Sequence, residues 1–220
     1  MEDQELLRLW KKQENKIDEL LNINSQLLKE QISQKARKAL VGLKAEKVLG
    51  IVTGAIYILF LGALLGIGVA ATPYKIDFFV LSIGAIFLVN LKVFIDYIRH
   101  LVMVSQINFE RPVADIQEQL LTLKLSLINS TRFVVLQIPF YTTWHLGNSW
   151  FPNHANPSWV IIQYVITGLF ACLAVFLFWY IKPKNAGKKW VKWVISSAGI
   201  SHIEKSLIQL QELKDFKADS

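Results

Sequence analysis

Charged residues are scarce in this chain of 220 residues, and one long stretch has none at all. Asp, Glu, Lys and Arg make up 19% of the residues, which is below the roughly 25% typical of soluble domains. No charged residue lies between Arg132 and Lys182. A soluble domain of this size needs polar groups on its surface, so the stretch is instead typical of a segment inside a lipid bilayer.

The chain also lacks the residue patterns on which most active sites are built. It has a single cysteine, Cys172, which excludes an internal disulfide and a CxxC metal site. The four histidines are scattered, and no HExxH, GxSxG, Walker or GxGxxG pattern occurs. No acid lies deep in an apolar stretch, which argues against a proton-coupled transporter. The sequence therefore predicts no enzyme, no catalytic or metal-ligating residue and no cofactor.

Four apolar stretches predict a polytopic, all-α membrane protein. The predicted transmembrane helices are residues 48–71, 76–95, 132–147 and 158–181. About 20 residues cross a typical hydrocarbon core, so the uncharged region after Arg132 is long enough for two helices. A turn rich in Pro and Asn divides that region at 147–158. Pro73 is expected to end the first helix, and Pro139 is expected to kink the third.

Residues 1–47 predict a cytosolic amphipathic helix. Its apolar seam recurs at heptad spacing, and Asn24 fills one position of the seam. The seam residues are Trp10, Ile17, Leu20 and Leu27. Two interpretations are open: this helix packs on other cytosolic helices of its own chain, or it binds a partner protein or a second copy as a coiled coil. In the second interpretation the four seam residues form the partner-binding site.

Two further segments, 96–131 and 182–220, are also predicted to be cytosolic and helical. The first has an apolar seam formed by Val113, Ile116, Leu120, Leu123 and Leu127, and the second has one formed by Ile200, Ile203, Leu207 and Leu210. The second segment begins with lysines interleaved with tryptophans, which is typical of a helix lying among lipid headgroups. The predicted membrane-surface residues are Lys184, Lys188, Lys189, Trp190, Lys192 and Trp193. A nucleic-acid patch would look similar, but the position beside a transmembrane helix favours lipid, so no nucleic-acid partner is expected.

The distribution of Lys and Arg predicts the orientation of the chain. Residues 1–47 hold ten of them and residues 182–220 hold eight, whereas the turn at 147–158 holds none. Positive charge accumulates on the cytoplasmic side of membrane proteins. The sequence therefore predicts four crossings, with both termini and the loop between the second and third helices in the cytoplasm.

The N-terminal third resembles a family of small, largely uncharacterised four-span bacterial membrane proteins of the Bacteroidota type. The residues that carry the resemblance are 9–13 (LWKKQ), 16–21 (KIDELL) and 47–51 (KVLGI). The resemblance implies a multi-pass protein of the bacterial cytoplasmic (inner) membrane with an N-terminal cytosolic amphipathic helix. It carries over no functional residue.

Two functions from different classes fit these features. The first is a non-enzymatic membrane regulator or scaffold whose cytosolic helices bind a soluble partner, in the manner of an anti-sigma-like tether. The second is a homo-oligomeric channel, with Gln137, Thr142 and Thr143 lining the pore. Glycines at GxxxG spacing in the first transmembrane helix permit close helix packing, which suits a homo-oligomer. The polar content of the third transmembrane helix separates the two hypotheses, and it is modest, which favours the regulator.

Overall fold

The computed structural model describes residues 2–71, 77–147 and 151–219, and every regular element in these ranges is a helix. The elements are α1 (Glu2–Ala71), α2 (Phe78–Ser105), α3 (Val113–Val134), the 3-10 helix η1 (Val135–Thr142), α4 (Pro157–Tyr180), the 3-10 helix η2 (Pro183–Asn185), α5 (Lys189–Ile195), the π-helical turn η3 (Ser196–Ile200) and α6 (Ser201–Asp219). The all-α prediction is therefore confirmed for these ranges. The predicted turn at 72–76 and residues 148–150 of the second predicted turn lie outside them.

Helix α1 is uninterrupted over 70 residues. At about 1.5 Å per residue it is roughly 105 Å long, about three times the thickness of a bilayer core. Its sequence contains no proline, so nothing interrupts the backbone hydrogen bonding between its polar half and the apolar half that begins at Val48. The boundary predicted between residues 47 and 48 is therefore only a change of composition, and the helix continues through it.

Helix α2 begins at a side-chain cap and continues beyond the predicted second span. The carboxylate of Asp77 accepts a hydrogen bond of 2.8 Å from the backbone N–H of Phe78, as helix N-caps do. The helix ends at Ser105, ten residues beyond the predicted end of the span at residue 95.

Three helices in the described ranges are long and apolar enough to cross a membrane: Glu30–Ala71 of α1, α2 and α4. Their apolar side chains point outward. In α4, which is described along its whole length, the buried side chains are Gln163 and Ala174, whereas Leu169 is 66% exposed. A helix that buries its glutamine and exposes its leucines matches an apolar surrounding, not water. These features are compatible with a multi-pass membrane protein.

The predicted third span does not form the expected kinked α-helix. Helix α3 runs past Arg132 without a break, but it ends at Val134. The next eight residues form η1, which contains Pro139. Proline has no N–H and its ring clashes with the preceding turn, so an α-helix does not continue through it without distortion. The chain responds by tightening into a 3-10 helix, and this region is not among the three candidate membrane helices.

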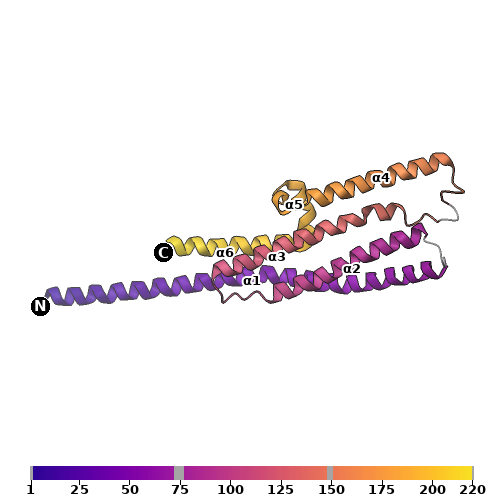
Figure 1. Ribbon diagram of the computed structural model, residues 1–220. Helices are drawn as coiled ribbons and strands as arrows, with labels where there is room; N and C mark the ends of the chain where they lie inside the picture. Colours follow the sequence, from indigo (N-terminus) through magenta and orange to yellow (C-terminus); the bar gives the residue numbers. More distant parts are fainter. Residues whose placement is uncertain (1, 72–76, 148–150, 220) are drawn as a thin grey trace.

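The long helices lie antiparallel in chain order, with both chain ends on the same side of the molecule (Figure 1). Contacts at both ends of α2 confirm its pairing with the α3–η1 segment. His100 Nε2 is bonded to Ser126 Oγ at 2.9 Å, and Ser82 Oγ is bonded to Thr143 Oγ1 at 2.8 Å. Helix α4 then returns beside η1.

Glycines of α1 allow α2 to approach closely. A Cβ added at Gly50 would lie 2.2 Å from Cε1 of Tyr97, and one added at Gly68 would lie 2.8 Å from Cε1 of Phe79. The aromatic rings of α2 therefore occupy the space left by missing side chains on α1. The close approach predicted from the GxxxG spacing is made within the chain, between α1 and α2.

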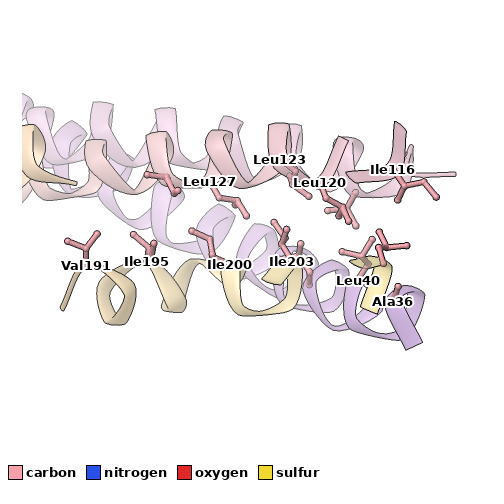
Figure 2. Close-up of a cluster of buried hydrophobic side chains, with 14 of the residues drawn as sticks. Ala36, Leu40, Ile116, Leu120, Leu123, Leu127, Val191, Ile195, Ile200 and Ile203 are labelled. Carbon is pink, nitrogen blue, oxygen red and sulfur yellow. The ribbon is translucent and has the colours of Figure 1, made fainter. Parts of the chain in front are cut away.

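The largest buried core lies where α1, α3, α5 and α6 meet, and we call this assembly the bundle (Figure 2). Both predicted apolar seams of the later segments face this core. The fully buried residues of this core include Leu43, Ile116, Leu120, Leu123, Leu127, Val191, Ile195, Ile200, Ile203 and Leu210. Helix α6 packs antiparallel to α1, and Ser206 Oγ donates to the carbonyl of Ala36 at 3.4 Å.

The bend between α5 and α6 requires glycine. Gly199 has a φ of +87°, in the left-handed region that costs other residues conformational energy. A Cβ at this position would also lie 2.4 Å from Cδ1 of Leu43. The bend therefore lets the start of α6 lie directly on α1.

We expect Gly50→Ala to destabilise the protein by about 1–3 kcal/mol, because the added methyl group overpacks the α1–α2 contact at Tyr97. Gly66→Ala is the matched control, since a Cβ there meets nothing within 4 Å. Thermal unfolding of the two variants in the same mild detergent, followed by circular dichroism, measures the difference. Equal melting temperatures for both variants would contradict the close α1–α2 packing.

Candidate functional site

The N-terminal end of α1 projects beyond the bundle (Figure 1), and we call residues 10–27 the α1 extension. The last residues of the extension reach the bundle, since Gln26 borders a cavity with Ile116 and Leu210. All four predicted partner-binding residues are exposed on the extension. The exposed fractions are 70% for Trp10, 55% for Ile17, 60% for Leu20 and 54% for Leu27. The packing among the described residues therefore leaves this stripe uncovered. The side chain of Asn24 lies outside the described part.

The exposed stripe and the bundle contact use different sides of α1. Burial of α1 in the bundle follows Ala36, Leu40, Leu43 and Lys47, at 4-3-4 spacing. At about 100° per residue, the mean direction of the stripe differs from that of the buried positions by roughly 140°. A molecule bound to the stripe would therefore not displace α3 or α6 from α1.

The six predicted membrane-surface residues are also all exposed, on one side of α5 and on the segment before it. Trp193 is 79% exposed. On the other side of α5, Val191 and Ile195 are fully buried in the bundle core. Trp190 stacks on the ring of Tyr180, with ring centroids 4.7 Å apart. The arrangement is that of an amphipathic helix fixed by its apolar side, with its Lys and Trp residues outward.

One of these lysines has a second role inside the bundle. Glu204 of α6 accepts from Lys124 of α3 at 3.0 Å and forms an ion pair with Lys192 of α5 at 3.1 Å. Partial burial by itself raises the pKa of the Glu204 carboxyl, but the hydrogen bonds from the two lysines outweigh it and lower the pKa below its ordinary value. Glu204 thus links three helices through its charged form.

The three predicted pore-lining residues all have polar partners within the chain. Gln137 Oε1 accepts from Asn90 Nδ2 at 2.7 Å. The Thr142 hydroxyl is bonded to Thr167 at 3.0 Å, and its carbonyl accepts from Gln163 at 2.6 Å. The hydroxyl of Thr143 is bonded to Ser82. These bonds join η1 to α2 and α4, which accounts for the polar residues without a pore, and the pore-lining role stays a prediction.

A cavity lined by both apolar and polar side chains was not predicted from the sequence. It measures about 260 Å³ and is bordered by α1, α2, α3, η1 and the α5–η3 segment. Its polar lining includes Lys47 and His100, each only 1% exposed. One feature of the sequence could have indicated this cavity: Lys47, four residues after Leu43, puts a charged residue at a position of the apolar seam.

The described residues contain no cluster of three or more His, Cys, Asp or Glu side chains that could hold a metal ion. Cys172 lies exposed on α4. Comparison of the chain with protein-family models, with curated proteins and with solved structures gives no match.

Protonation of Glu204 is expected to weaken the bundle. A carboxyl whose pKa is lowered by folding contributes stability that is present above its unfolded pKa of about 4.3 and is lost as the pH falls through the folded value. Wild-type protein should therefore be more stable than Glu204→Gln at pH 7, by about 1 kcal/mol. The difference should begin to shrink as the pH falls below the unfolded value and should be lost once the pH passes the lower folded pKa, where the native carboxyl becomes neutral.

Melting temperatures in detergent across this pH range measure the effect. Glu118→Gln, at an exposed carboxylate of α3, is the control for the loss of one negative charge. A wild-type advantage over Glu204→Gln that stays constant down to pH 3.5 would argue against the ion pairs.

Proposed function

We propose that this protein is a non-enzymatic, membrane-anchored regulator or scaffold whose α1 extension binds a soluble helical partner. The observation that carries the proposal is the exposed apolar stripe of the extension, projecting from a bundle that is already packed. A soluble monomer rarely leaves a regular apolar stripe uncovered, because burying such side chains is favourable by about 1.5–3 kcal/mol each.

The proposed anchor consists of four crossings. Helices α1, α2 and α4 provide three of them by length and composition. The end of α3 together with η1 provides the fourth, since this segment runs antiparallel beside α2 and then pairs with α4. Backbone that is not α-helical is tolerated at membrane depth where it is enclosed by protein. The side-chain bonds from Asn90, Ser82 and Gln163 to η1 support such an enclosed position.

The bundle and the α1 extension are proposed to lie in the cytoplasm of a bacterial cell, beneath the inner membrane. The support is the excess of Lys and Arg on the segments that form them, because such charges favour the cytoplasmic side. The outward Lys and Trp residues of α5 would then lie at the level of the lipid headgroups, where both side-chain types are favoured.

Single-cysteine labelling tests this topology in a Cys172→Ser background. Three exposed positions are used: Glu110→Cys between α2 and α3, His154→Cys before α4, and Lys184→Cys after it. A membrane-impermeant maleimide added to intact spheroplasts should label position 154 and should label 110 and 184 only after permeabilisation. Labelling of 110 and 154 from the same side would refute the crossing by η1.

The stripe fits a partner helix. From Trp10 to Leu27 it covers 17 residue steps, about 26 Å along the helix axis. Its residues are spaced seven, three and seven apart, which is heptad spacing, as in helices that pack side by side or in a groove. The neighbouring exposed side chains carry both signs of charge, including Lys11, Glu14 and Glu19, which suits a polar rim around an apolar contact.

Photo-crosslinking in cells tests the partner surface in the full-length protein. A benzoylphenylalanine at Leu20 should give a light-dependent adduct with one soluble protein, because Leu20 is central in the stripe. The same residue at Asn15, which is exposed on the other side of α1, is the matched control and should give none. Adding Leu27→Asp should reduce the Leu20 adduct by about tenfold or more, because it places a charge in an apolar contact.

The mass and identity of the adduct decide between the alternatives. A distinct soluble protein in the adduct supports the proposed function. An adduct made only of two copies of this chain would replace the soluble partner with self-association and would favour the homo-oligomer. Equal adduct yields at Leu20 and Asn15, or none at either, would contradict a binding site on the stripe.

A further inference from the structure

The cavity beside Lys47 contains an ammonium group that lacks an anionic partner. Lys47 Nζ donates to the carbonyl of Ala198 at 2.9 Å and lies 4.3 Å from the centre of the Tyr97 ring. Within the described ranges it forms no ion pair with a carboxylate, whereas other buried charges in proteins are usually paired. Removing an ammonium from water costs several kcal/mol, and one carbonyl and one ring offset only part of this cost.

The two acids closest to these groups in the sequence are engaged elsewhere. Glu46 lies 3.7 Å from His202 on α6. Asp96, one helical turn before His100, forms its ion pair with Lys92. Neither acid lines the cavity. The positive charge of Lys47 is therefore not balanced from within the cavity wall.

A second polar group of the same wall has an unused hydrogen-bonding position. His100 is buried, and its Nε2 is bonded to the hydroxyl of Ser126. Its Nδ1 has no hydrogen-bond partner among the described residues. If Nε2 accepts from Ser126, the neutral ring carries its proton on Nδ1 and offers it as a donor. Lys47 and His100 thus line the same cavity, and a buried donor without an acceptor is costly.

We propose that this cavity is a binding site for a phosphate-type oxyanion, held by Lys47 Nζ and the Nδ1–H of His100. Such an anion supplies the missing negative charge and accepts from both donors, and charge-assisted bonds of this kind are about twice as strong as neutral ones. At about 260 Å³ the cavity accommodates a phosphate group and is small for a nucleotide or another drug-sized ligand.

Two kinds of molecule carry such a phosphate-type oxyanion: free phosphate and the headgroup of an anionic lipid. The cavity adjoins a second one of about 310 Å³ between α1 and α2, and Val93 and Tyr97 line both. The second cavity offers room for an acyl chain beside the headgroup. The test therefore uses both sources as separate probes.

The first probe is radiolabelled inorganic phosphate, bound at equilibrium to the full-length protein in a neutral detergent. The second is phosphatidylglycerol, with its retention on the protein compared with that of phosphatidylcholine by native mass spectrometry. We expect at least one anionic probe to bind saturably. Lys47→Gln should weaken that binding at least about tenfold, because it removes the charged donor. Lys44→Gln, at an exposed position of the same helix, should leave binding unchanged.

A second variant keeps the test decisive if Lys47→Gln does not fold. Val135→Phe leaves both donors in place and fills part of the cavity that Val135 lines, so it should also abolish binding. Binding of phosphate alone identifies a free anion, and binding of phosphatidylglycerol alone identifies a headgroup. The proposal is overturned if neither probe binds, if Val135→Phe or a folded Lys47→Gln binds as wild type does, or if Lys44→Gln loses binding equally.

Discussion

The packing of α1 is the interaction on which the rest of the structure depends. One helix of 70 residues contacts α2 along its apolar half and α6 along its polar half. The two contacts use different chemistry. Beside α2, missing side chains at Gly50 and Gly68 admit aromatic rings, and tight van der Waals packing of this kind is what holds helices together in lipid. In the bundle, leucines and isoleucines are buried together, which the hydrophobic effect favours in water.

Polar groups then decide how the remaining segments join this pair. Helix α6 is placed by the bend at Gly199 and by the ion pairs of Glu204 with Lys124 and Lys192. The 3-10 helix η1 is bonded to both neighbouring helices by side-chain hydrogen bonds. Such bonds matter most where water is absent, because an unmet polar group is then most costly. The cavity at Lys47 is the conspicuous departure from this pattern in the described structure.

The architecture separates three tasks along the axis of α1. The outward apolar helices suit anchoring, the bundle gives a rigid base, and the α1 extension presents side chains away from both. A long continuous helix is stiff enough to hold an exposed stripe at a fixed distance from that base. The cavity lies where bundle and apolar helices meet, since its walls combine α1, α2, α3, η1 and the α5–η3 segment. An anion bound there would contact each of these elements at once.

The sequence alone determined the helices and the faces that they bury. Heptad seams on α3 and α6 appear as buried rows, because a period near 3.6 residues puts such side chains on one face. Composition was sufficient to identify three helices that are candidates for crossing a membrane. Only the tertiary structure decided which faces meet. In the folded chain Trp10, Ile17, Leu20 and Leu27 are exposed. Part of the predicted third helix is the 3-10 helix η1, and Lys47 and His100 line one cavity. The physical reason is that periodicity identifies a face by hydrophobicity, whereas pairing depends on the shape and polar groups of residues far apart in the chain.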